Sequence, residues 1–208
     1  MGLIAITVPA TDKTLLSIDE MRLAAGLDQG DQSKDTALRT LNAQLSRVIT
    51  STCRVRSDGV NEPTLRRETI AETYRLSECM AGLFLSRPLA PAIVSITEDG
   101  TAVDAADYEL DAVCGIVRRL DNDEYDEWEA AKVIVTYQAG FSVVPSDLKL
   151  AMQKLVSSIT ASEGRDPSLK RLKVDGVSEH EWWVGPVSDP IIPQEVMDLL
   201  APYRKILV

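Results

Sequence analysis

The segment VIVTYQAGFSVVPSDLKLAMQKLV, residues 133–156, decides the fold, because a β-strand gives way to an α-helix within it. Val, Ile, Thr and Tyr fill its first positions, which is typical of a strand, and Gly140 permits a turn. Ser146 is the predicted N-cap of the helix that follows, and Asp147 suits the positive end of that helix. The turn also carries Ser142, so it is either a catalytic site or only a corner.

Two amphipathic helices are expected to form a helical bundle. The first has apolar residues at three- and four-residue spacing from about residue 38 to 52, and the second begins near residue 146. A shorter helix is expected before them, from the capping box Ser17–Glu20 to about Gly26. Burial of a large aliphatic side chain contributes roughly 1.5 to 3 kcal/mol, so the two apolar stripes should form the core. The predicted core residues are Leu41, Leu45, Val48, Leu148, Met152 and Leu155.

Between the two long helices, from about residue 64 to 137, short β-rich runs are broken by turn residues. The sequence Glu98-Asp99-Gly100 is a predicted hairpin turn, because Gly tolerates a positive φ. We therefore predict the α+β class: a small α-helical bundle with an inserted antiparallel β subdomain. One domain of about residues 1–167 is expected to contain both.

An extended C-terminal arm is predicted from residue 168 to 208, where the composition changes to Pro, Gly and isolated apolar residues. Two runs of β character lie on either side of Asp175-Gly176, and a short terminal helix is expected just after Pro193. The apolar residues of the arm have little periodic partner of their own. The arm therefore either folds back on its own domain or binds another subunit.

The chain is acidic, with 32 Asp and Glu residues against 22 Lys and Arg residues in 208, and a formal net charge of −10. It lacks the excess of basic residues that binding to DNA phosphates requires, so a DNA-gripping role is disfavoured. Its three scattered cysteines fit a reducing compartment and are interpreted as small buried hydrophobes. Neither a membrane span of roughly 18 apolar residues nor a secretion signal is expected.

Catalytic chemistry has little support in the sequence. Residues 140–144 read GFSVV, so Ser142 has only half of the G-x-S-x-G pattern, and His180 is the one histidine that could act as its base. We interpret the turn as a corner and expect no enzymatic activity. The cysteines and His180 have no paired ligand spacing, and no phosphate-binding loop is present, so neither a metal nor another cofactor is expected.

Several segments carry a resemblance to a known family. The most specific are RPLAPAIVSIT at residues 87–97, VTYQAGFSVVPSDLKLAM at 135–152 and LLAPYRK at 199–205. In this order they resemble the head-tail connector, or adaptor, family of tailed bacteriophages and gene transfer agents. The resemblance covers nearly the whole chain, but residues 56–63 and 121–129 match nothing specific in the family.

The resemblance implies a homo-oligomeric ring, usually of twelve copies, below the portal of a DNA-filled head. Such a ring continues the DNA channel without sequence-specific DNA binding, and it lies in the neck of a virion or phage-like particle made in the bacterial cytoplasm. The arm is implied to bind the portal protein, and the far side of the ring the next neck or tail-completion protein. The anchor candidates in the arm are Trp182, Trp183, Ile191, Ile192, Leu199, Leu200 and Tyr203. Packing of the arm on its own domain is the alternative for about half of them.

The middle of the chain concentrates negative charge, with twelve acidic and two basic residues from Glu98 to Glu129. In a ring, a channel wall with this charge repels phosphates and lets DNA slide; a solvated outer face is the alternative. The candidate channel residues are Asp121, Asp123, Glu124 and Asp126. Two other functions stay open: another neck or tail-completion protein of the same particle, and a serine hydrolase that uses Ser142.

Overall fold

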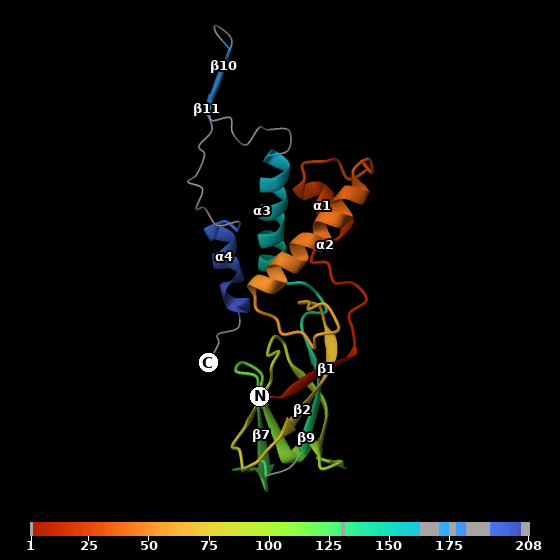
Figure 1. Ribbon diagram of the computed structural model, residues 1–208, viewed down its shortest axis with the longest axis vertical. Coiled ribbons are helices and arrows are strands. Elements are labelled where there is room, and N and C mark those ends of the chain that lie inside the picture. Colours follow the sequence, from red (N-terminus) through yellow and green to blue (C-terminus); the bar gives the residue numbers. More distant parts are fainter. Residues whose placement is uncertain (1, 130–131, 163–170, 175–177, 182–191, 205–208) are drawn as a thin grey trace.

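The computed structural model describes residues 2–129, 132–162, 171–174, 178–181 and 192–204, with the segments 171–174 and 178–181 described by their backbone alone. The chain forms two parts that lie end to end along the long axis of the molecule, a helical bundle and a β part (Figure 1). Helices and antiparallel strands occupy separate regions, so the predicted α+β class is confirmed.

The helical bundle contains α1 (Ile18–Ala24), α2 (Asp35–Thr52), α3 (Ser146–Ser162) and α4 (Gln194–Leu200). The capping box of α1 is confirmed: the Glu20 N–H donates to Ser17 Oγ over 3.2 Å, and the Ser17 N–H donates to the Glu20 carboxylate over 2.8 Å. The predicted cap of α3 is wrong by one residue. Ser146 is the first helical residue, because the Lys149 N–H already donates to the carbonyl of Pro145. As predicted, α4 starts directly after Pro193.

The core of the helical bundle lies where these four helices meet. Four of the six predicted core residues are buried in it: Leu45, Leu148, Met152 and Leu155. Leu41 is partly buried against the same cluster. The prediction is wrong for Val48, which is 38% exposed, because the next residue, Ile49, takes the inward position on α2. From α4, Val196 and Leu200 also enter this core.

The β part contains two antiparallel sheets. Its strands are β1 (Leu3–Val8), β2 (Glu68–Arg75), β3 (Leu83–Phe84), β4 (Ala92–Glu98), β5 (Thr101–Ala102), β6 (Tyr108–Asp111), β7 (Ile116–Asp121), β8 (Glu124–Asp126) and β9 (Lys132–Ala139). Five strands pair in the order β1-β2-β9-β4-β5, and the second sheet has the order β3-β7-β6 with β8 also paired to β7. The predicted turn at Asp99-Gly100 joins β4 to β5, and both residues have positive φ, 46° and 86°, which is the type I′ combination.

One apolar core fills the space between the two sheets. Alternate residues of β9, among them Val135 and Tyr137, are fully buried, as the period of two along a strand requires. Trp128 is also fully buried, and its indole Nε1–H donates to the carbonyl of Val117 on β7 over 3.1 Å. This bond gives the polar end of a large side chain a partner inside the core.

The first strand, β1, is not predicted by the sequence pattern. Its sequence, LIAITV, is a short apolar run without the alternation of apolar and polar residues that marks a half-buried strand, and only Ile4 is buried. It pairs with β2, with Leu3 opposite Thr73, and forms an edge of the five-stranded sheet. The β part is therefore more than an insertion between helices, because its edge strand precedes α1.

The two β runs predicted in the arm are confirmed as β10 (Arg171–Val174) and β11 (Ser178–Glu181). They pair with each other in antiparallel register. Both strands lie beyond the end of α3, away from the β part (Figure 1).

The strand-to-helix turn between β9 and α3 is held by its backbone. Gly140 has a φ of +90°, and its N–H donates to the carbonyl of Leu89 over 2.8 Å. The next N–H, of Phe141, donates to the carbonyl of Leu65 over 2.8 Å. A Cβ at position 140 would overlap the carbonyl of Arg66, so this corner requires glycine both for its conformation and for its space.

The substitution Gly140→Ala is expected to lower the free energy of unfolding by at least about 1 to 3 kcal/mol, the cost of a strained backbone, and by more because of the overlap with Arg66. The matched control is Gly100→Ala, since Gly100 has a similar φ of +86° but nothing within 4 Å of an added Cβ. Denaturant unfolding of both variants measures the difference. Equal losses would show that the close approach at Gly140 is unimportant.

Candidate interaction surfaces

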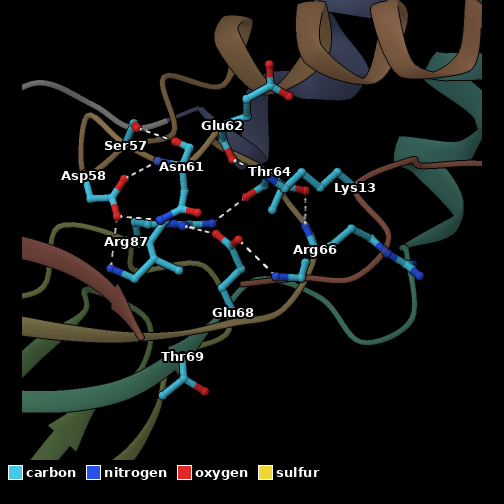
Figure 2. Close-up of polar contacts among 12 residues, drawn as sticks. Lys13, Ser57, Asp58, Asn61, Glu62, Thr64, Arg66, Glu68, Thr69 and Arg87 are labelled. Carbon is cyan, nitrogen blue, oxygen red and sulfur yellow. Dashed lines mark hydrogen bonds and ion pairs between the residues drawn. The ribbon is translucent and has the colours of Figure 1, made fainter. Parts of the chain in front are cut away.

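A buried ion pair lies where the β part meets the helical bundle. The guanidinium of Arg87 contacts the carboxylate of Glu68 over 2.6 Å, with side chains 4% and 0% exposed. Arg87 also donates to the carbonyl of Thr64, and the other carboxylate oxygen of Glu68 accepts the N–H of Ala10 over 3.1 Å (Figure 2). The cluster therefore ties β2 to the two chain segments that lead to the helices, one from β1 and one from α2.

Asp58, in the segment from α2 to β2, fixes the outer edge of β1. Its carboxylate accepts the N–H groups of Val60, Asn61 and Ile6, the last over 3.2 Å (Figure 2). Burial alone would raise the pKa of Asp58, but the hydrogen bonds from Asn61 and its neighbours outweigh it and hold this pKa well below its ordinary value. Because Ile6 donates to Asp58, this part of the β1 edge has no free donor for another strand.

A second buried carboxylate, Glu72, lies on β2. It accepts hydrogen bonds from the backbone and hydroxyl of Ser86 and from the hydroxyl of Tyr137 over 2.9 Å. Burial, together with the nearby charge of Glu72, raises the pKa of Tyr137 and of Tyr74 far above the ordinary value. These hydroxyls therefore stay protonated and serve as donors, which makes the cluster structural.

The C-terminal helix α4 is part of the helical bundle. The hydroxyl of Tyr203, in the 3-10 turn Ala201–Tyr203 after α4, donates to the carboxylate of Asp147 on α3, with O···O distances of 2.6 and 2.7 Å. The ring of Tyr203 also meets that of Phe141 edge to face at 5.7 Å. Burial and the neighbouring carboxylate raise the pKa of Tyr203, which keeps its proton on the hydroxyl. Lys154 of α3 pairs with Glu195 of α4 at the surface.

The predicted anchors of the arm divide into two groups. Trp182, Trp183 and Ile191 lie outside the described residues. The other four pack on the helical core of their own chain: Ile192, Leu199, Leu200 and Tyr203. Leu200 is 0% exposed, so the structure assigns it to the core and not to an accessible anchor, which corrects that part of the prediction. Its burial follows from the amphipathic pattern of α4, which turns Val196 and Leu200 toward α3.

The four candidate channel residues gather on one hairpin. Asp121, Asp123, Glu124 and Asp126 are all exposed, in the β7–β8 hairpin or its turn. The hairpin belongs to the β part, at the end of the molecule that lies away from the helices (Figure 1). The same hairpin carries Arg118 and Arg119 on β7. Arg119 is opposite Asp126 in the strand pair and approaches Asp107, and Arg118 approaches Asp111 and lies over the ring of Tyr125. The four carboxylates outnumber these two basic residues, so the hairpin keeps a net negative charge.

Ser142 lies exposed in the corner between β9 and α3, and its candidate base His180 is a residue of β11. These two positions are at opposite ends of α3 (Figure 1). A helix of 17 residues is about 25 Å long, so a Ser142–His180 pair has to span that length. The arrangement therefore supports the corner interpretation of this turn.

Other chemical sites find little support in the part of the chain that the structure describes. Among those residues, no group of three His, Cys, Asp or Glu side chains lies close enough to hold a metal ion. A groove of about 710 Å³ lies between α2, the α1–α2 connection and the end of α3, and Lys34 is its only charged lining residue. No helix among the described residues is long and apolar enough to cross a membrane.

The cysteines differ from the prediction. Cys53 is buried, and its burial raises the pKa of its thiol to about 11. Cys79 and Cys114 are exposed, so the interpretation of all three as buried hydrophobes is wrong for these two. Both lie near turns of the β part, where the sequence has little periodicity to indicate burial.

The fold, compared with known proteins, matches a solved structure although no protein-family model and no curated protein matches the sequence. The matching structure is described as the neck of an empty GTA particle computed with C6 symmetry. The two chains are 19% identical with a TM-score of 0.58, and the match covers 99% of this chain and 96% of the other. At this identity the match shows a shared fold and no more.

The substitution Arg87→Met is expected to lower the free energy of unfolding by about 3 to 5 kcal/mol, because it leaves the buried carboxylate of Glu68 without its charged partner. The double substitution Arg87→Met with Glu68→Gln should recover part of this loss, since no buried charge remains. Guanidinium unfolding measures both.

The matched control is Arg47→Met, which breaks the exposed ion pair with Glu62 and should cost less than about 1 kcal/mol. If Arg87→Met and Arg47→Met lower the free energy of unfolding equally, the Arg87–Glu68 pair does not hold the β part and the helical bundle together.

Proposed function

We propose that this chain is a structural head-tail adaptor of a tailed phage or phage-like particle. It forms a ring below the portal, joins the DNA-filled head to the tail and continues the DNA channel. The observation that carries the proposal is the match of the fold, over nearly its whole length, to a chain in the neck of a GTA particle. The three segments that resemble the adaptor family support the same proposal; they lie in β4 and the segment before it, across the β9–α3 corner, and at the end of α4 with the turn that follows.

We propose that the two ends of the molecule bind different partners. The arm, residues 168–208, leaves the helical bundle at the end of α3 and returns to it at α4. Because α4 is packed in its own bundle, we assign the portal contact to Trp182, Trp183 and Ile191, in the part of the arm before α4. Ile192, Leu199 and Tyr203 then fasten the end of the arm to the bundle. The β part faces the next neck or tail-completion protein.

We infer that the acidic β7–β8 hairpin lines the DNA channel. Exposed carboxylates repel the phosphates of DNA, and repulsion prevents the duplex from sticking to the wall during transfer. The four carboxylates are exposed on one hairpin, which is the arrangement that a repulsive surface requires.

A second candidate within the same particle is another neck or tail-completion protein. The fold match favours it as much as it favours an adaptor, because the matching chain is described only as part of a neck. The location of the defect in particles that lack the protein separates the two.

Deletion of the gene is expected to give DNA-filled or leaking heads and separate tails, visible by electron microscopy. An adaptor is required for the two parts to join, whereas loss of a tail-completion protein leaves a neck on the head and defective tails. Normal tailed particles would remove the proposal. A chain with Ser142→Ala should restore joined particles as well as the wild-type chain does, since Ser142 is assigned no chemistry; failure of this variant alone would instead favour the hydrolase.

Reversal of the acidic hairpin, with Asp121, Asp123, Glu124 and Asp126 all changed to Lys, is expected to reduce DNA delivery per assembled particle, because a basic wall binds phosphates. The matched control changes the same residues to Asn or Gln, which removes the repulsion without adding attraction and should have a smaller effect. Transfer of a marker gene, normalised to the number of joined particles, measures it. Unchanged delivery by the Lys variant would contradict a channel role for this hairpin.

A further inference from the structure

The hairpin β10–β11 is a two-stranded sheet that stands apart from the other two sheets. Among the described residues β10 pairs only with β11, so the outer edge of each strand has no strand beside it. The pair lies beyond the end of α3, away from the body of the molecule (Figure 1). A lone two-stranded hairpin is marginally stable in water, and its open edges are templates for pairing with another chain.

The two strands of this hairpin carry opposite charges. β10 has the sequence RLKV and β11 the sequence SEHE. In the register of the pair, Arg171 is opposite Glu181 and Lys173 is opposite Glu179. Because residues two apart share a face, all four charged positions belong to one face of the hairpin. One edge of that face is therefore basic and the other edge is acidic.

A surface of this kind is complementary to a second copy of itself. If β11 of one copy lies antiparallel to β10 of the next in the register of the hairpin itself, both Glu positions lie beside a basic position; a shift of two residues keeps the faces aligned and leaves one such pair. The complementarity continues from copy to copy, because each hairpin offers one basic and one acidic edge. Pairing of two β10 edges or two β11 edges instead places like charges opposite each other.

We propose that β10–β11 is the contact by which neighbouring copies of this chain join edge to edge, with β11 of one copy beside β10 of the next. The ring arrangement rests on the proposed function, but the pairing of copies does not. Related by rotation about one axis, the hairpins form a continuous antiparallel sheet that closes on itself and leaves no open edge.

The dimensions suit a channel. With the twelve copies that the resemblance implies, about 24 strands spaced about 4.8 Å apart give a circumference of at least about 115 Å and a diameter of about 37 Å. A closed sheet of this size leaves room for a DNA duplex.

The test uses a charge-swapped chain, with Arg171→Glu, Lys173→Glu, Glu179→Lys and Glu181→Lys. Within this chain the hairpin keeps its opposite charges, and copies of it remain complementary to one another. Next to a wild-type copy, however, Glu meets Glu or Lys meets Lys. Tagged wild-type chain is produced in the host cell together with untagged wild-type or untagged swapped chain, and assemblies are isolated through the tag and weighed by mass spectrometry.

We expect tagged wild-type chain to recover untagged wild-type chain, and to recover the swapped chain about tenfold less. Equal recovery of both would overturn the proposal, and so would failure of tagged wild-type chain to recover any untagged copy. The swapped chain keeps opposite charges within each hairpin and between its own copies, so it should self-associate as the wild-type chain does. Failure of the swapped chain to recover tagged copies of itself would also count against the proposal.

The recovery assay and the gene-deletion experiment fail separately. If gene deletion prevents the joining of heads and tails but wild-type and swapped chains are recovered equally, only the hairpin contact is wrong. If particles without the protein are normal, the adaptor role is wrong, and the recovery assay still tests the pairing of copies.

Discussion

The buried pair between Arg87 and Glu68 is the constraint on which the arrangement of the two parts depends. A single carboxylate on β2 receives Arg87 from the segment before β4 and the N–H of Ala10 from the segment before α1, while Arg87 also holds the carbonyl of Thr64. Among the described residues, Arg87 and Glu68 are each other's only charged partner in the interior. The segments that carry Arg87, Ala10 and Thr64 therefore have to keep one position relative to β2, because any other position would leave a buried charge unpaired. The corner at Gly140 adds a fourth segment, because its N–H is fixed to Leu89.

A rigid junction has a purpose in a protein whose two ends differ in chemistry. The helical bundle carries the arm with its β10–β11 hairpin at one end, and the β part carries the net acidic β7–β8 hairpin at the other. In a ring, every copy has to present both ends at the same angle, and a flexible junction would spread these angles. The buried, hydrogen-bonded pair of Arg87 and Glu68 suits a rigid junction. A small displacement of either side chain weakens its hydrogen bonds in a medium of low dielectric constant, which raises the free energy.

The sequence predicts the elements better than it predicts their partners. The helices and the hairpin turn at Asp99-Gly100 follow from local rules of periodicity, capping and positive φ. The edge strand β1 is missed because its sequence, LIAITV, is a short apolar run without alternation. The helix α4 is assigned to an arm although Val196 and Leu200 complete the bundle. The pairing of β1 with β2 and the packing of α4 on α3 join segments that are far apart in the chain, and the periodicity of a local sequence does not predict such contacts.

The buried glutamates could have been found. Glu68 and Glu72 stand in phase with Ile70 and Tyr74 along β2, so a strand that buries the two apolar residues also buries the two acids. A carboxylate at a core position demands a partner, and Arg87 lies in one of the three segments that resemble the adaptor family. The identity of that partner, however, depends on the tertiary path of the chain.

The place of β1 has a consequence for synthesis on the ribosome. The strand precedes α1 and α2 in the chain, yet its partner β2 emerges only after both helices, and β2 in turn needs β9 on its other side. The sheet therefore closes late, and α3 and α4, which complete the helical core, both follow β9. Pairing between such distant segments is slow. A nascent chain accordingly lacks a complete helical core until α4 has been made, and the hairpin β10–β11, which precedes α4, is synthesised before the body that carries it can fold completely.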